Sequence, residues 1–179
     1  AIVEGLLRKE EDSVRQILGN CIFGVDNETI ETSVLKQLRK KKKTVAIAEL
    51  TSGGLAAHRL LNRNPEGDIF LGAIVPTSPK SLAILFKNKE KLSGDETSAK
   101  KLAETVKEKF QADIGLAITG KHDVDDKSKG ETYLAIATSN KVIVDKLMLP
   151  GDRIRTAQYS VITIFNNLRL YLENLTTKE

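Results

Sequence analysis

The chain has 179 residues, 40% of them hydrophobic, which is enough for one globular domain with a sizeable core plus some additional structure. Its 28 basic and 24 acidic residues leave a net charge of only +4 and it has no Trp, so we do not expect a nucleic-acid partner or an aromatic base-stacking platform. The single Cys21 excludes an internal disulfide framework and favours a reducing, cytoplasmic location, and we expect neither a signal peptide nor a membrane-spanning segment.

The first element in the chain is a charged amphipathic helix over residues 2–18. The pair Gly19-Asn20 ends it. Its apolar positions, which we expect to make contacts, are Leu6, Leu7, Val14, Ile17 and Leu18. Because the chain begins at Ala1 rather than Met, we also expect it to be part of a longer chain with an N-terminal domain.

A second helix follows, for which Asp26-Asn27 resemble a cap. Its apolar residues recur every fourth position, at Ile30, Val34 and Leu38. It ends in the basic run 39–43, which is typical of a solvated helix C-terminus whose cations suit the helix dipole; a polyanion site is the alternative. We assign residues 1–40 to a helical lead-in and residues 41–179 to the main domain.

From residue 44 onward, predicted strands alternate with predicted helices. The strands are 44–48, 69–75, 113–119, 131–138 and 141–149. The helices are 54–62, 79–86, 97–110 and 153–174, the last with Ile154, Val161, Phe165, Leu168 and Leu172 facing inward. This alternation predicts an α/β fold: a mixed sheet flanked by helices on both faces, in three α/β/α layers, with the N-terminal helical extension.

Two predicted strands end in short turns of hydroxyl-bearing residues and glycines, Thr51-Ser52-Gly53-Gly54 and Thr119-Gly120. The carboxyl ends of strands are the usual place for a ligand cleft in such sheets. Backbone N–H groups of the first turn could bind a phosphate at the start of the next helix, or the turn could be a helix cap with glycines for tight packing. The tip of this turn, however, is Leu50, which carries no reactive group.

These segments, in this order and spacing, resemble the C-terminal domain of the competence/damage-inducible protein CinA, a family that includes nicotinamide mononucleotide amidohydrolases. The resemblance runs from about residue 22 to residue 172. The segments that carry it are IFGVDNETIE, TVAIAELTSGG, FLGAIVPTSPKSLAILF, ADIGLAITG and LPGDRIRTAQYSVITIFNNLRLYL. It implies a nicotinamide nucleotide as ligand and a homodimer, whose assembly the amphipathic helices at both ends also favour; we expect no cofactor.

Two positions depart from the family pattern. Where the family carries A-E-S-C-T-G-G, whose serine is implied to attack the carboxamide, this chain has Leu50; the lysine implied to act as base aligns with Leu82. A hydroxyl nucleophile needs a nearby base, and leucine supplies neither group. The loop 121–130 also lacks the family's later glycines, which backbone near a ligand often needs. We therefore predict an impaired amidohydrolase that acts as a binding or assembly module.

Two alternatives stay open. In the first, Thr51 or Ser52 has become the nucleophile of an active deamidase; Lys80 is a poor substitute base because a two-residue offset on a helix turns a side chain by about 200°. In the second, the chain is a DNA-associated competence or repair factor, which only the basic run 39–43 supports.

The resemblance also implies a set of substrate-binding residues. Arg153 aligns with an arginine of the family's G-D-R stretch and could pair with a phosphate; its alternative is a surface salt bridge. The loop containing His122 has acidic neighbours but no EF-hand pattern, so we expect a solvated loop and no metal site. The full predicted set is Thr51, Ser52, Gly53, Gly54, Ser78, Thr119, Gly120 and Arg153.

Overall fold

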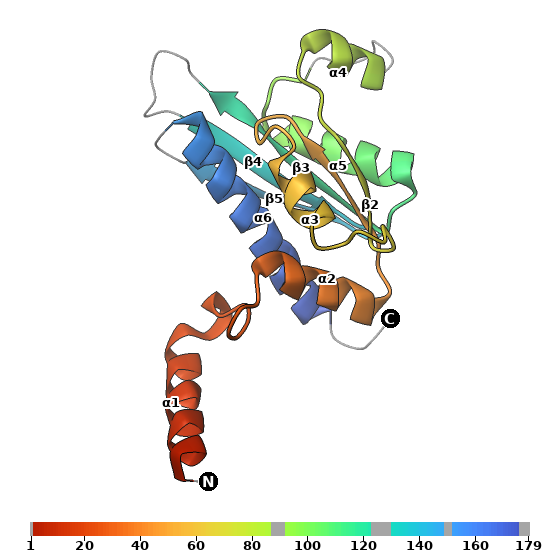
Figure 1. Cartoon of the computed structure of the whole chain (residues 1–179). Coiled ribbons are helices and arrows are strands. Elements are labelled where there is room, and N and C mark those ends of the chain that lie inside the picture. Colours follow the sequence, from red (N-terminus) through yellow and green to blue (C-terminus); the bar gives the residue numbers. More distant parts are fainter. Residues whose placement is uncertain (1, 87–91, 123–129, 149–151, 176–179) are drawn as a thin grey trace.

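The structure, a computed structural model, describes residues 2–86, 92–122, 130–148 and 152–175 (Figure 1). The helices are α1 (Ile2–Leu18), α2 (Ile30–Lys41), α3 (Leu55–Leu61), α4 (Pro79–Leu85), α5 (Glu96–Phe110) and α6 (Arg153–Asn174), with a 3-10 turn η1 (Gly19–Cys21) after α1. The strands are β1 (Val45–Glu49), β2 (Phe70–Ile74), β3 (Ile114–His122), β4 (Gly130–Ala137) and β5 (Val142–Met148).

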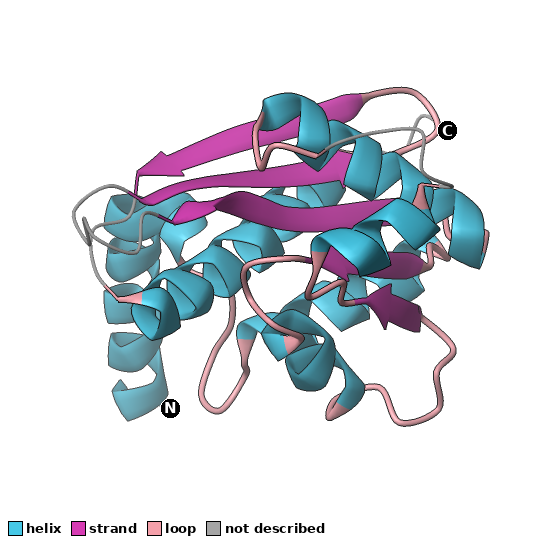
Figure 2. Ribbon diagram, turned by 90° about the horizontal axis from the view of Figure 1, so that it is seen from above, coloured by secondary structure: helices cyan, strands magenta, loops and turns pink. Residues whose placement is uncertain are grey.

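The strands form one mixed sheet in the order β2-β1-β3-β4-β5. Strand β1 is parallel to both β2 and β3, and β4 is antiparallel to β3 and to β5. Figure 2 shows the strands side by side with helices in front of them and behind them. The predicted mixed α/β sheet is confirmed.

Alternation along the strands builds a different apolar layer on each face of the sheet. In β1, Val45 and Ile47 belong to the layer covered by α2, α3 and α6, whereas Ala46 and Ala48 belong to the layer covered by α5. The small alanines on the second face let α5 approach the sheet closely. Figure 1 shows α6 and α5 on opposite faces, so the three-layer architecture is confirmed.

Three details differ from the sequence-based expectations. The residue that caps α2 is Thr29, whose hydroxyl accepts from the N–H of Thr32, so the expected Asp26-Asn27 cap is wrong. Strand β3 continues through His122 because Lys121 and His122 pair with β4, and Gly130 belongs to β4; residues 123–129 of the expected loop lie outside the described residues. Ile154, in the first turn of α6, is 71% exposed, so its expected inward orientation is wrong.

Helix α1 stands away from the body of the molecule (Figure 1). Its apolar residues, expected to make contacts, are exposed, and among the described elements it contacts η1. The connection beyond it is held to the body because the Nη2 group of Arg169 in α6 donates to the carbonyl oxygen of Asn20.

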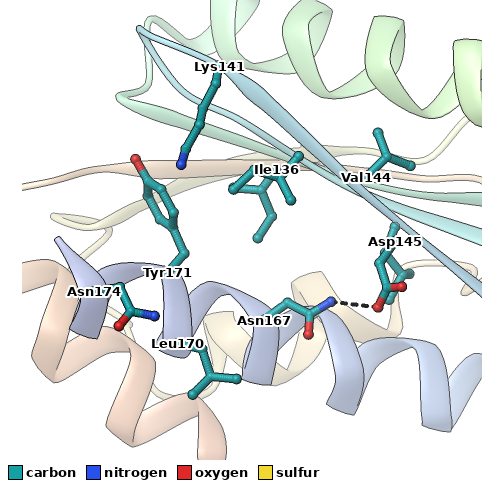
Figure 3. A pocket seen from close by; sticks show the side chains of 10 residues that line it. Ile136, Lys141, Val144, Asp145, Asn167, Leu170, Tyr171 and Asn174 are labelled. Atoms are coloured by element: carbon teal, nitrogen blue, oxygen red, sulfur yellow. Dashed lines mark hydrogen bonds between the residues drawn. The ribbon is translucent and has the colours of Figure 1, made fainter.

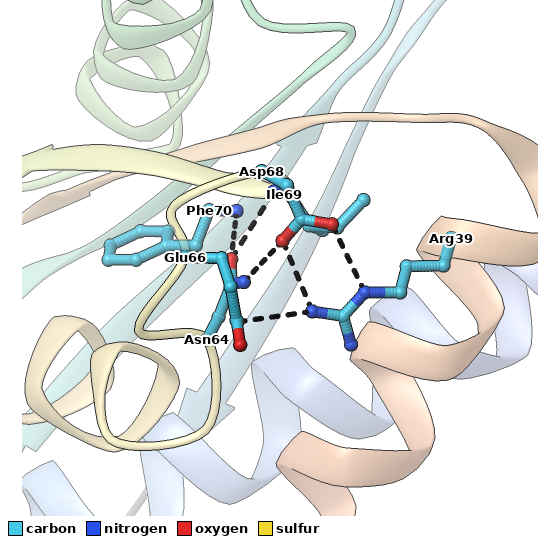
Figure 4. Close-up of polar contacts among 6 residues, drawn as sticks. All are labelled: Arg39, Asn64, Glu66, Asp68, Ile69 and Phe70. Carbon is cyan, nitrogen blue, oxygen red and sulfur yellow. Dashed lines mark hydrogen bonds and ion pairs between the residues drawn. The ribbon is translucent and has the colours of Figure 1, made fainter.

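Residues of the basic run 39–43 take part in the structure of the domain, and Figure 4 shows the contacts of Arg39. Arg39 donates from Nε and Nη2 to the Asp68 carboxylate at 3.2 and 3.1 Å, and this contact raises the pKa of Arg39 and lowers the pKa of Asp68. Lys43 pairs with Asp113 at 3.7 Å, and Lys41 donates to the carbonyl of Leu175. These contacts favour the helix-terminus interpretation of the run over a polyanion site. Among the described residues, no helix is long and apolar enough to cross a membrane.

Candidate functional site

A buried glutamate organises the turn between β1 and α3. Glu49 is 0% exposed, and its carboxylate accepts from the Ser52 hydroxyl at 2.6 Å, the Ala56 N–H at 3.0 Å and the Ala57 N–H at 2.7 Å. A carboxylate at a helix N-terminus is favoured by the helix dipole and by the unpaired N–H groups there. Glu49 is not among the residues predicted from the sequence, although an acidic residue at the end of a buried strand, just before a helix start, is an available signal.

The Glu49 contacts bear on the expected phosphate site. The N–H groups of Ala56 and Ala57, in the first turn of α3, already have an anionic partner, Glu49. The Ser52 hydroxyl donates to the same carboxylate. Gly53 and Gly54 adopt φ values of +64° and +91°, a region that favours glycine. The geometry therefore supports the alternative interpretation of this turn as a helix cap with glycines for a tight connection.

The two positions that depart from the family pattern lie in one apolar layer. Leu50 follows Glu49 and lies on the other face of the sheet, where it packs against the layer formed by α5 and the β1 alanines. Leu82, on the short helix α4, packs against the same layer. Lys80, by contrast, is exposed. The structure thus brings Leu50 and Leu82 to one region, and both supply hydrocarbon to it.

Thr119 and Gly120 lie at the end of β3. Thr119 is 0% exposed, and its Oγ1 has no hydrogen-bond partner within the described residues. Alternation along β3 places Thr119 on the same face as Leu50. At Gly120 an added Cβ would lie 2.2 Å from the carbonyl oxygen of Glu131, so glycine is required there for close approach of β3 and β4.

Ser78 has a local structural role. Its hydroxyl accepts from the Ser81 N–H at 3.1 Å, and its own N–H donates to the Ser81 hydroxyl at 3.0 Å. This reciprocal pair is a capping box that starts α4. The hydroxyl that the resemblance implies for substrate binding is therefore engaged by its own helix.

A cavity of about 320 Å³ lies between the β1–α3 turn and the N-terminal end of α6. Its lining is Thr51, Ser52, Gly53, Leu55, Arg153, Ile154, Ala157 and Gln158. The structure therefore brings together four of the predicted residues, Thr51, Ser52, Gly53 and Arg153. The Oγ1 atom of Thr51 is buried and has no hydrogen-bond partner within the described part of the chain.

The remaining predicted residues do not join this cavity. Gly54, Ser78, Thr119 and Gly120 are absent from its lining, and Thr119 faces the α5 side of the sheet together with Leu50. The predicted set is thus divided between the two faces of the sheet, with the cavity on the α6 side.

One polar cluster that the sequence did not suggest lies beside the end of β3. Lys146 donates to Glu131 at 2.7 Å, the Tyr133 hydroxyl donates to the same carboxylate at 3.1 Å, and the Lys146 ammonium lies 5.5 Å from the centre of the Tyr133 ring. The contact with Glu131 raises the pKa of Lys146 and lowers the pKa of Glu131. A lysine held protonated in this way is a poor general base.

Comparison with known proteins decides the family. The sequence model of the CinA C-terminal domain matches residues 27–172, most of the chain. The chain belongs to the CinA C-terminal domain family. A competence-damage inducible protein of Thermoanaerobacter pseudethanolicus is 32% identical over 176 residues, covering 93% of this chain and 43% of that protein. A CinA-like protein of Kosmotoga olearia is 33% identical over 161 residues, covering 85% of this chain and 39% of that protein.

Solved structures of CinA proteins share the fold. A CinA superfamily protein from Klebsiella pneumoniae gives a TM-score of 0.73 at 17% identity, covering 81% of this chain and 96% of that one. A competence/damage inducible protein from Agrobacterium tumefaciens gives 0.69 at 18% identity, covering 85% and 98%. This CinA domain therefore corresponds to nearly the whole of those chains, but it spans less than half the length of the curated relatives it matches.

Proposed function

We propose that this CinA C-terminal domain is a catalytically impaired member of the nicotinamide mononucleotide amidohydrolase family, acting in the cytoplasm as a binding or assembly module of a longer CinA-like protein. One observation carries the proposal. Leu50 and Leu82, at the positions where the family resemblance implies a nucleophilic serine and its lysine base, both pack against the same apolar layer.

The chemical consequence follows from what the two missing groups do. Hydrolysis of a carboxamide through a covalent intermediate requires a nucleophile whose proton is removed as it attacks. General-base assistance alone is worth about two to four orders of magnitude in rate. With a hydrocarbon side chain at both positions, only positioning of the substrate is left to accelerate the reaction.

A second candidate, an active deamidase with a relocated nucleophile, rests on Ser52. Its hydroxyl lies 2.6 Å from the Glu49 carboxylate, a distance at which a nucleophile can transfer its proton to a base. Ser52 also lines the cavity together with Thr51. Against it, Glu49 also accepts the N–H groups of Ala56 and Ala57, so the contact is explained by the helix cap.

Reversion of the two leucines tests the first candidate. The double variant Leu50→Ser with Leu82→Lys should release ammonia from nicotinamide mononucleotide, while the matched single variant Leu50→Ser, which lacks the base, should stay near background. Ammonia release by the unmodified protein that is above background and equal to that of the double variant would contradict the proposal. The fold of each variant is checked by circular dichroism.

We infer further that the phosphate of a nicotinamide nucleotide binds at Arg153, at the edge of the 320 Å³ cavity. The guanidinium offers paired donors for phosphate, and Arg153 is exposed at the cavity edge. Titration calorimetry with nicotinamide mononucleotide should show binding that Arg153→Gln weakens about tenfold, as expected for loss of a charged hydrogen bond. Arg155→Gln, in the same turn of α6 but outside the cavity lining, is the control; equal weakening by both variants contradicts a specific contact.

A further inference from the structure

Helix α1 presents an apolar face that nothing in the described molecule covers. The exposed fractions of its apolar side chains are 68% for Val3, 60% for Leu6, 65% for Leu7, 47% for Val14, 82% for Ile17 and 49% for Leu18. At 100° per residue these six positions fall on one side of the helix. A surface of this kind on an otherwise polar helix marks an interaction site.

One carboxylate lies in the middle of this face. Glu10 follows Leu7 by three positions and precedes Val14 by four, so it shares their side of the helix. It is exposed and has no ion-pair partner within the described residues, whereas the neighbouring Glu11 pairs with Arg15 at 2.7 Å. The surface that covers α1 should therefore be apolar and carry one cation.

The same chain carries a groove with these properties. A cavity of about 430 Å³ lies between β4, β5 and α6 (Figure 3). Leu134, Ile136, Ile143 and Leu170 supply its apolar surface. At one end, the Lys141 ammonium lies 5.5 Å from the centre of the Tyr171 ring.

The charges at the two ends of the groove differ in availability. Asp145 accepts from the Asn167 side chain at 3.1 Å, so this carboxylate is engaged. Lys141 is exposed and has no carboxylate partner in the described part of the chain. The groove thus offers an apolar floor with a single cation free to pair, which is the complement of the α1 face.

We propose that α1 of one copy docks into the β5–α6 groove of a second copy, with Glu10 opposite Lys141. Helix α1 points away from its own body, so its face is presented to another molecule rather than to its own groove (Figure 1). Each copy supplies one helix and one groove, so reciprocal docking closes a two-fold dimer and leaves neither surface uncovered. This assembly is independent of whether the domain hydrolyses an amide.

Charge reversal tests the pairing in the 179-residue chain. Sedimentation velocity across a dilution series should show a dimer, and Glu10→Lys or Lys141→Glu should each raise the dimer dissociation constant at least about tenfold. The double variant should return it to within about threefold of the unmodified value. Asp12→Lys, on another side of α1, and Lys40→Glu, on α2, are matched controls that should leave it unchanged. All these side chains are exposed, so folding should be preserved.

Disulfide trapping identifies the occupant. In a Cys21→Ser background, chains carrying Glu10→Cys mixed with chains carrying Lys141→Cys should form a covalent heterodimer on mild oxidation. A monomeric protein, a dimer insensitive to Lys141→Glu, or crosslinking of Glu10→Cys chains only to one another overturns the proposal. Crosslinking only within single chains that carry both substitutions overturns it as well, because the helix would then occupy its own groove.

Discussion

Glu49 is the residue on which the β1–α3 turn depends. Its buried carboxylate satisfies one hydroxyl and two backbone N–H groups that have no other acceptor among the described residues. Removing this carboxylate leaves the hydroxyl and the two N–H groups buried without hydrogen bonds. The free-energy cost of such unsatisfied groups exceeds the net stabilisation that the hydrogen bonds provide.

We therefore expect Glu49→Ala to lower the free energy of unfolding by about 3 kcal/mol. Glu49→Gln should cost less, because its amide keeps one acceptor oxygen. Urea denaturation measures the free energy of unfolding of both variants. Glu66→Ala, at an exposed position in the turn before β2, is the control. A loss below about 0.5 kcal/mol for Glu49→Ala would remove the structural role assigned to this residue.

Asp95 is the cap residue of α5. Its carboxylate accepts from the Ser93 hydroxyl and from the N–H and hydroxyl of Ser98, and these bonds lower its pKa to about 2. Because the pKa is lower in the folded protein than the value of about 3.9 in an unfolded chain, this residue stabilises the fold fully above pH 4 and progressively less as the pH falls toward 2.

The corresponding variant is Asp95→Ala. It should lower the free energy of unfolding by about 1 kcal/mol at pH 7, and the difference from the unmodified protein should shrink when unfolding is measured near pH 2.5. Asp152→Ala, which removes the analogous cap of α6, provides a comparison at neutral pH. A difference that is the same at both pH values would contradict the role assigned to the ionised cap.

At the scale of elements, the packing of α5 on the sheet depends on Gly115 in β3. A Cβ at this position would lie 2.0 Å from the carbonyl oxygen of Ala103 and 2.7 Å from the Cβ of Lys107. The helix therefore rests directly on the strand backbone, and there is no space for a side chain.

Gly115→Ala should accordingly destabilise the protein by about 2 kcal/mol, in the range found for overpacked cores. Gly5→Ala is the matched control, since a Cβ there meets nothing within 4 Å and alanine is the better helix former. Thermal unfolding followed by circular dichroism compares the two. An unchanged melting temperature for Gly115→Ala would contradict the close contact.

Elements with a strong apolar period could be predicted from the sequence, and α6 was placed with the bounds Arg153–Asn174 that the structure has. The errors arose where local signals compete. Thr29 caps α2 although Asp26 and Asn27 are also good caps, because the cap must directly precede the first helical turn. Which face of α1 would be covered could not be predicted, since periodicity reveals an apolar face but not its partner.

The candidate site was less predictable for a geometric reason. A strand sends successive side chains to opposite faces, so adjacent residues of one turn need not share a site. Leu50 therefore lies on the α5 face while Glu49 lies beneath α3, and the residues that resemble the family's site are divided between an apolar layer and a cavity. Glu49 was missed because its role appears only when the helix start is placed over it.

At the scale of the whole molecule, this CinA domain keeps the family's architecture and has leucine at both positions implied to perform the chemistry. The most direct test is ammonia release from nicotinamide mononucleotide by the purified, unmodified protein, measured against buffer. We expect no release above background. Turnover that Ser52→Ala or Thr51→Ala abolishes would contradict it and establish a relocated nucleophile.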